Sequence, residues 1–438
     1  MSFKEFRFGK MPTHWESKRI IDYTEIVTDY VANGSFASLK ENVTYFEDPN
    51  YAVLIRLTDY NRGFDGQFVY IDEHAYNFLS KTQLFGGEII ISNVGANVGT
   101  VFKVPYLRKK MNLGPNSIMV KTKGNDDFYF YWFSSPNGQE SIKSILSGSA
   151  QPKFNKTSFR NLELPIPPYK EQNAIAHILS TLDDKIEVNN QINKTLENMA
   201  QAIFKQWFVD FEFPNEDGEP YKSSGGEMVE SELGMIPKGW EVKSLCDIAR
   251  IDTKSIKPFE NGDVLYEHYS IPALDANNYP NFEYGREIKS NKYKVFEDSI
   301  LISKLNPSTK RIWLPLYLSN RAICSTEFLN YRPRDTRIKA FVYSIIDSTR
   351  FTEFLMNHVT GSTGSRQRVK PQDTLSYKFA MPNSDMLKEF CEVIDGIYTK
   401  KNNNLNENQN IKAIRDSLLP KLMSGEIRVP LNEEGDAS

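Results

Sequence analysis

The 438-residue sequence has few cysteines and no long uninterrupted apolar run. Cys246, Cys324 and Cys391 are widely spaced, without the paired spacing typical of metal sites or disulfide frameworks. No run of about 18 apolar residues exists, which predicts that no segment spans a membrane. The N-terminal residues lack the apolar core of a signal peptide. These features predict a soluble protein of the reducing cytoplasm.

Motifs of catalysis and cofactor binding are also missing. The five histidines are isolated from one another, and the sequence has no HExxH, Walker A or Gly-x-Ser-x-Gly pattern. The glycines at 95 and 99 are wrongly spaced for a dinucleotide-binding loop. Residues 306–309, Asn-Pro-Ser-Thr, faintly resemble the loop of amino-methyltransferases but lack its second proline and its aromatic residue. We therefore expect a binding protein with no catalytic residues, no metal site and no bound cofactor of its own.

What the sequence does contain is a duplication. Three patterns of the first half recur in the same order in the second half. They are residues 11–18 and 236–243, residues 89–92 and 300–303, and Gly-Ser-x-Gln at 148–151 and 364–367. The repeat is far longer than the roughly 20–50 residues of a solenoid unit. It predicts two similar domains, which suits a chain longer than one core supports.

Each half ends in a polar, helix-favouring stretch. Residues 169–213 contain no glycine or proline, and their apolar residues recur at spacings of three and four, typical of a coiled-coil seam. The predicted helix-contact or partner-binding residues are Ile175, Leu179, Leu182, Ile186, Leu196, Ala200, Ile203, Trp207 and Phe208. The second stretch, residues 385–419, is interrupted by Gly396 and Asn402–Asn404, which weakens the helix prediction, and should stop at Pro420.

If the second helix returns towards the first domain, the two helices pair antiparallel. Asn189 and Asn190 would then meet residues 402–404 near the middle of the pair, where buried asparagines can fix the register. The alternative is that these asparagines face solvent.

The predicted fold is therefore a mixed α/β (α+β) fold with a pseudo-twofold internal repeat. Two similar globular domains are separated by two long antiparallel helices that form a coiled coil. The predicted boundaries are residues 1–164 for the first domain, 165–213 for the first helix, 214–236 for a linker, 237–382 for the second domain, 383–425 for the second helix and 426–438 for a tail.

The formal net charge of −3 conceals a strongly uneven distribution. Residues 101–123 contain six basic residues and no acidic one, and residues 301–340 contain eight basic and two acidic residues. The linker, by contrast, has seven acidic residues against one lysine between 212 and 232. A matched pair of basic segments favours contact with nucleic acid, although many charged clusters are only solvated faces.

At this point the residues resemble a known family. Residues 164–172 (LPIPPYKEQ), 234–242 (GMIPKGWEV), 300–307 (ILISKLNP) and 418–427 (LLPKLMSGEI) resemble, in order, the specificity subunits of Type I restriction–modification systems. The first half departs mildly, since Glu88 stands where an aspartate often follows the glycine, and residues 11–15 lack the glycine before the tryptophan.

The resemblance implies a non-catalytic DNA-recognition subunit of the cytoplasm with no membrane partner. Its two target-recognition domains would read a bipartite, asymmetric sequence in double-stranded DNA. Its helices would dock two modification subunits that hold S-adenosylmethionine and methylate adenine. Two restriction subunits, where present, would add ATP- and Mg²⁺-dependent cleavage. The rival interpretations are a self-sufficient DNA methyltransferase or nuclease, and a coiled-coil scaffold without DNA specificity.

Residues suited to DNA contact occupy matching positions in the two halves. Arginine suits guanine and glutamine suits adenine at base edges, while lysine and arginine also bind phosphate. The expected base-reading loops contain Arg366, Gln367, Arg368 and Lys370 in the second half, and Gln151, Lys153 and Asn155 in the first. The expected phosphate contacts are Lys304, Lys310, Arg311, Lys103, Arg108, Lys109 and Lys110. The other matched loop adds Ser92, Asn93 and Asn97.

Overall fold

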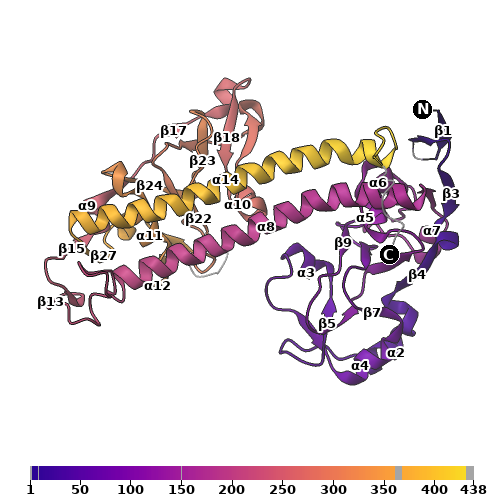
Figure 1. The fold of residues 1–438 in the computed structure, drawn as a ribbon, viewed down its shortest axis with the longest axis horizontal. Coiled ribbons are helices and arrows are strands. Elements are labelled where there is room, and N and C mark those ends of the chain that lie inside the picture. Colours follow the sequence, from indigo (N-terminus) through magenta and orange to yellow (C-terminus); the bar gives the residue numbers. More distant parts are fainter. Residues whose placement is uncertain (1, 8, 149, 361–366, 431–438) are drawn as a thin grey trace. The chain divides into compact units, whose positions relative to one another are not determined.

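A computed structural model describes residues 2–7, 9–148, 150–360 and 367–430. The chain divides into two compact units (Figure 1), of which unit 1 comprises Met1–Ile186 with Gln409–Ser438 and unit 2 comprises Glu187–Asn408. Helices α8 (Tyr169–Phe208) and α14 (Ser384–Met423) each contribute one part to each unit. Among the described residues, no helix is both long enough and apolar enough to cross a membrane.

Unit 1 is built on two four-stranded sheets. The first has the order β6 (Val69–Ile71), β5 (Ala52–Ile55), β10 (Lys110–Leu113), β7 (Gln83–Leu84). The second has the order β4 (Thr24–Asp29), β11 (Ser117–Thr122), β8 (Ile89–Ser92), β9 (Val101–Lys103). Strand β5 pairs parallel with β10 and is buried along its length, which explains its unbroken apolar run.

Two strand pairs and several short helices complete unit 1. The pairs are β1 (Phe3–Phe6) with β2 (Gly9–Pro12), and β3 (Glu16–Arg19) with β12 (Glu163–Ile166). The helices are α1 (Ile20–Tyr23), α2 (Phe36–Asn42), α3 (Leu57–Asn61), α4 (Glu73–Phe78), α5 (Asp126–Ser134), α6 (Pro136–Lys143) and α7 (Lys156–Arg160). Asn125, Ser135 and Asn155 cap α5, α6 and α7 by accepting backbone N–H groups, which explains where these helices begin.

Unit 2 repeats this strand order. Its first sheet is β19 (Asn281–Tyr284), β18 (Leu265–Tyr269), β23 (Ala322–Ser325), β20 (Lys292–Lys294), β17 (Ser255–Ile256), with β18 and β23 parallel. Its second sheet is β16 (Ala249–Ile251), β24 (Phe328–Pro333), β21 (Ile300–Ser303), β22 (Ile312–Trp313). Only β17 is added, so β18 and β23 correspond to β5 and β10, and β21 corresponds to β8.

The smaller elements of unit 2 follow the same plan. The strand pairs are β13 (Met228–Ser231) with β14 (Gly234–Pro237), β15 (Glu241–Ser244) with β27 (Lys378–Met381), and β25 (Val359–Thr360) with β26 (Arg368–Val369). The helices are α9 (Leu245–Ile248), α10 (Ile271–Asn277), α11 (Lys339–Asp347), α12 (Thr349–Asn357) and α13 (Pro371–Thr374).

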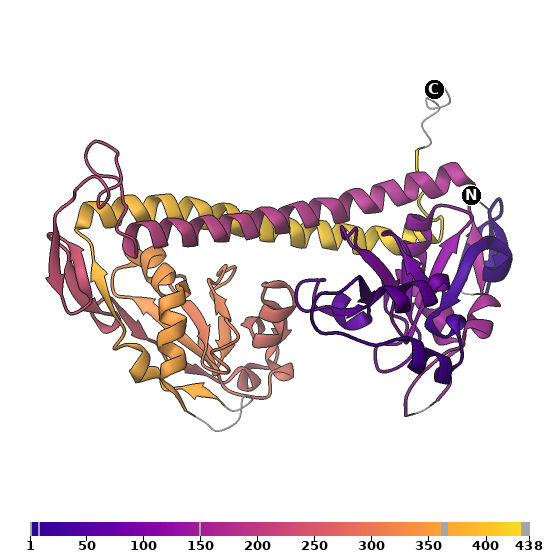
Figure 2. The ribbon, with the colours of Figure 1, turned by 90° about the horizontal axis from the view of Figure 1, so that it is seen from below.

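In each unit α8 and α14 run side by side (Figure 2). In unit 1, Ile175 and Leu179 of α8 share a core with Leu422 and Met423 of α14. In unit 2, another set of α8 residues, Ala200, Phe204, Trp207 and Phe208, packs with Leu387, Phe390 and Ile394 of α14. Of the predicted seam residues, Ile186 is buried, whereas Leu182, Leu196 and Ile203 are half-buried. Trp207 and Phe208 are 9% and 7% exposed, because they fill the core of unit 2.

The asparagines of both helices meet in unit 2. Asn189 Nδ2 donates to Asn408 Oδ1 at 2.9 Å, and Asn404 Nδ2 donates to Asn193 Oδ1 at 2.9 Å. All four are buried, while Asn403 is exposed. The two bonds join residues in opposite order along the two helices, so the helices are antiparallel in this unit.

Two helix boundaries differ from the sequence-based prediction. Helix α14 is continuous through Gly396, whose low helix propensity weakened the prediction, and it continues past Pro420, so the expected stop at Pro420 is wrong. Ile394 and Tyr398, on either side of Gly396, are buried in the core of unit 2, and this packing outweighs weak local propensity. Pro420 lies in the last turn, where the burial of Leu422 and Met423 in the core of unit 1 maintains the helix despite the hydrogen bond that proline cannot donate. Helix α8 ends at Phe208 rather than continuing to 213, and Phe211 takes a left-handed φ of 59° just beyond it.

Candidate nucleic-acid interface

In unit 1, two loops far apart in the sequence are joined by backbone hydrogen bonds. The turn between β8 and β9, residues 93–100, lies against residues 147–155. Phe154 N donates to Asn93 O at 3.1 Å, Gly95 N donates to Pro152 O at 3.0 Å, and Val94 forms a bridge with Lys153. Gly95 has a φ of 101°, which explains the glycine.

In unit 2, the corresponding loops are joined in the same way. The turn between β21 and β22, residues 304–311, pairs with residues 367–369. Asn306 N donates to Gln367 O at 3.1 Å, and Leu305 forms a bridge with Arg368. The two loops that recur in each half of the sequence are therefore brought together in each unit. We call each pair a loop pair.

The candidates of the unit 1 loop pair are mostly accessible. Asn97, Gln151 and Lys153 are exposed, and Asn155 is exposed although its side chain caps α7. Ser92 is buried, and its Oγ has no hydrogen-bond partner among the described residues. The same holds for Asn93 Oδ1. This loop pair therefore offers amide and hydroxyl groups around a single cation, Lys153.

The basic run of unit 1 lies elsewhere. Lys103 pairs with Ile89 at the end of the β8–β9 hairpin opposite the turn, and Arg108, Lys109 and Lys110 follow beyond that end. Lys103 Nζ lies 2.6 Å from Asp127 Oδ1. Lys109 and Lys110 lie over the rings of Tyr70 and Tyr51, at 5.5 and 4.2 Å from the centroids, and Arg108 is exposed. The structure does not bring these cations to the loop pair.

Four cations of the unit 2 loop pair lie close to three carboxylates of the same unit. Lys304 Nζ lies 3.8 Å from Glu327, Lys310 Nζ 2.7 Å from Asp347, and Arg311 forms a bidentate pair with Asp275 at 2.7 and 2.8 Å. Arg368 lies 3.5 Å from Glu327. Lys370 is exposed, Gln367 is half-buried, and Arg366 lies outside the described residues.

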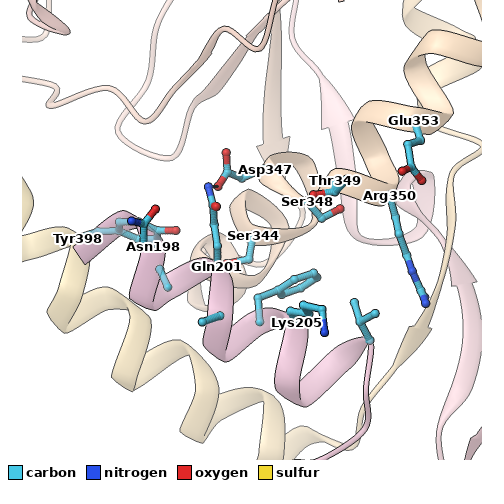
Figure 3. Close-up of a pocket in the computed structure, with 14 residues that line it drawn as sticks. Asn198, Gln201, Lys205, Ser344, Asp347, Ser348, Thr349, Arg350, Glu353 and Tyr398 are labelled. Atoms are coloured by element: carbon cyan, nitrogen blue, oxygen red, sulfur yellow. Dashed lines mark hydrogen bonds between the residues drawn. The ribbon is translucent and has the colours of Figure 1, made fainter. Parts of the chain in front are cut away.

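Asp347 also borders a cavity of about 560 Å³ in unit 2. Side chains of α8, α11 and α12 line it, together with Tyr398 of α14 (Figure 3). Gln201 Nε2 of α8 donates to Asp347 Oδ2 at 2.8 Å. Burial raises the pKa of Tyr398 and that of Tyr343, whose ring meets it edge to face, so both phenols stay neutral. The cavity therefore presents hydrogen-bonding and charged side chains from three helices beside the neutral Tyr398.

Asp275 and Asp347 are partners of the basic turn that sequence reasoning missed, whereas Glu327 is one of the two acidic residues of the basic segment 301–340. Asp275 precedes that segment by 26 residues and Asp347 follows it by seven. Only the fold brings them to the loop.

Neither metal nor thiol chemistry emerges from the described part of the chain. No group of three His, Cys, Asp or Glu side chains among those residues could hold a metal ion. Burial raises the pKa of the Cys324 thiol, and it raises that of Cys391 to about 11, so neither is a reactive thiolate.

Residues 12–198 match the family described as the Type I restriction modification DNA specificity domain. The chain is 28% identical to the Type I restriction enzyme MjaIX specificity subunit of Methanocaldococcus jannaschii, with 98% of this chain and 96% of that protein covered. It is 27% identical to the HindI specificity subunit of Haemophilus influenzae, with 73% and 80% covered.

The fold is similar to the crystal structure of the Type I restriction–modification S subunit from M. genitalium. The TM-score is 0.52 at 14% identity, with 95% of this chain and 98% of that chain covered. The sequence matches span both units, and each unit carries the same loop pair. Residues 12–198 therefore match the family of Type I restriction modification DNA specificity domains, and nearly the whole chain is similar to specificity subunits of Type I restriction enzymes.

Proposed function

We propose that this chain reads a bipartite, asymmetric target in double-stranded DNA, with one half-site recognised by each unit. In keeping with this similarity, it is a DNA sequence-recognition subunit without catalytic activity of its own. The observation that carries the bipartite reading is the recurrence of one loop pair on one strand order in both units. Because the loop residues differ between the units, the two half-sites should differ in sequence.

The proposed target-recognition domains are residues 1–164 and 237–382. Residues 165–213 and 383–425 would form the spacer helices, with 214–236 as linker and 426–438 as tail. We propose that the helices form a coiled coil with pseudo-twofold symmetry. The reciprocal bonds of Asn189 with Asn408 and of Asn193 with Asn404 support this, since exchanging the helices exchanges the two bonds. Buried asparagines fix register in such pairs.

The proposed partners are DNA, two methyltransferase subunits that carry S-adenosylmethionine, and restriction subunits with ATP and Mg²⁺ where the system encodes them, all in the cytoplasm. The relatives are subunits of Type I restriction enzymes, which supports a multisubunit assembly. The exposed face of α8 beside the unit 2 cavity, with Gln201 and Lys205, is one surface we propose for docking.

The test is co-expression with the modification subunit encoded beside this chain, followed by sequencing-based mapping of N6-methyladenine. We expect one split motif that disappears when this chain is omitted. Exchanging residues 237–381 for those of a relative should change one half of the motif and leave the other intact. Methyl transfer by the purified chain alone, or a cofactor-loaded complex that methylates no defined motif, would contradict the proposal.

A further inference from the structure

The turn between β21 and β22 in unit 2 is fastened to three different elements. Arg311 is held by Asp275 of α10 through two hydrogen bonds of 2.7 and 2.8 Å. Lys310 is held by Asp347 at the end of α11, at 2.7 Å from the carboxylate and 2.6 Å from the backbone oxygen. Lys304 donates to Thr326 O at 2.7 Å, beside the start of β24. Side-chain contacts therefore hold the turn on both sides of its tip.

The cations of these ion pairs are poorly placed to bind DNA phosphates, because each already has a carboxylate partner. The Asp347 side chain is 12% exposed and also accepts from Gln201 of α8 (Figure 3). Lys310 directs two hydrogen bonds at Asp347, and the Arg311 side chain is only 21% exposed. A phosphate contact at Lys310 would have to break a pair with a largely buried carboxylate. Leaving such a charge without a partner is costly.

The tip itself is compact and polar. Thr309 N donates to Asn306 O at 2.8 Å, which closes the turn, and Asn306 takes a left-handed φ of 47°. Pro307 is buried, whereas Ser308 and Thr309 are exposed. Hydroxyl groups both donate and accept hydrogen bonds, so they suit base edges of either kind. A fixed turn also loses less conformational freedom on binding.

We infer that Ser308 and Thr309 read base edges in the half-site of unit 2, and that Lys310, Arg311 and their acidic partners are positioning residues that hold this tip. The inference rests on the proposed function. It gives the Asn-Pro-Ser-Thr segment a role in recognition instead of catalysis. It also replaces the expectation that Lys310 and Arg311 contact phosphate.

The first experiment uses the complex of this chain with its modification subunit, after the split motif of the wild-type complex has been mapped. The double variant Ser308→Ala with Thr309→Val removes both hydroxyls at exposed positions, where folding is little affected. We expect about a tenfold loss of discrimination at one or more positions of a single half-site. An unchanged motif would overturn the inference, whereas a wild-type complex without any split motif would instead overturn the proposed function.

The second experiment separates positioning from phosphate contact. Binding of a duplex with the mapped motif is measured over a range of salt concentrations for Lys310→Met and the matched control Lys310→Arg, which keeps the charge. A phosphate contact contributes about 0.9 to the slope of log K against log salt. We expect Lys310→Met to keep the wild-type slope and to weaken discrimination in the same half-site as the hydroxyl variant, while Lys310→Arg restores discrimination. A slope reduced by about 0.9 with an intact motif would show that Lys310 contacts phosphate and would overturn this role. Thermal unfolding of each variant verifies that the complex remains folded.

Discussion

The two loop pairs occupy corresponding positions in sheets that have the same strand order, but different interactions hold them in place. In unit 1 the turn 93–100 contains no charged residue, and Gln139 of α6 holds it by donating to Gly99 O at 2.9 Å. In unit 2 the turn is held by ion pairs that include Lys310 with Asp347 and Arg311 with Asp275. The sheets therefore constrain where a loop lies, whereas its side chains and their partners can diverge. Such a fold can come to recognise a different DNA half-site through changes in its loops, while its buried core residues stay the same.

The same contrast extends to the first sheet of each unit. On β5 of unit 1 every residue is apolar, including the fully buried Val53. The corresponding β18 of unit 2 carries Glu267, which is also fully buried. Its carboxylate accepts from Leu318 N at 2.9 Å, from Ser319 N at 2.6 Å and from the Tyr269 hydroxyl. A buried acid thus orders the loop before β23 in unit 2 alone.

The largest effect on this comparison is expected from Glu267→Ala. The change leaves several buried donors without an acceptor, at about 1–3 kcal/mol each. We expect unit 2 to lose about 3–5 kcal/mol of unfolding free energy. Hydrogen exchange resolved by segment is the appropriate measurement, because a chain of two units need not unfold in one transition. Exchange should accelerate at residues 314–321 and in the surrounding sheet.

Val53→Ala is the matched control in unit 1. It removes apolar groups worth about 0.8 kcal/mol each and leaves no polar group unpaired. Its destabilisation should be smaller and confined to unit 1. A Glu267→Ala chain with wild-type exchange in unit 2 would mean that the carboxylate does not order the loop.

A smaller effect is expected from Gln139→Ala, which releases the turn of unit 1. The amide also donates to Phe133 O at 2.8 Å, so two carbonyl groups lose a donor, and the expected cost is about 1–2 kcal/mol. Discrimination should weaken in the half-site of unit 1, and, because the lost bonds are neutral, by the same factor at low and high salt. Methylation mapping at two salt concentrations on DNA in vitro measures both. Relaxation of the unit 2 half-site instead would contradict this assignment.

The sequence repeats predicted which loops correspond, and the structure joins these loops by hydrogen bonds within each unit. The repeats succeed because strands and turns depend on short patterns, such as residues 300–303, that survive divergence. The ion-pair partners could not be predicted, since Asp275 and Asp347 are separated from Lys310 in sequence and only the folded sheets bring them together.

The structure of the two long helices could also be predicted only in part from the sequence. Low local propensity near Gly396 weakened the helix prediction for α14, but packing of the flanking residues in the core maintains the helix. The antiparallel meeting of asparagines was one of two alternatives that the sequence left open. Its register, however, joins Asn189 to Asn408 instead of residues 402–404, because register depends on side-chain packing along the whole pair.

The smallest effect should come from replacing a single cation at the unit 1 loop pair. Such a replacement tests directly whether the two loop pairs differ in their use of cations. Lys153 is exposed beside the turn and forms no ion pair with another described residue, whereas Lys156, close by in sequence, lies 2.8 Å from Asp29. We expect Lys153→Met to lower the slope of log K against log salt by about 0.9, and to weaken binding equally for all sequences. Lys156→Met should keep the wild-type slope, because the Lys156 ammonium already forms an ion pair with Asp29. A wild-type slope for Lys153→Met would mean that unit 1 contacts DNA without using the cation of its loop pair.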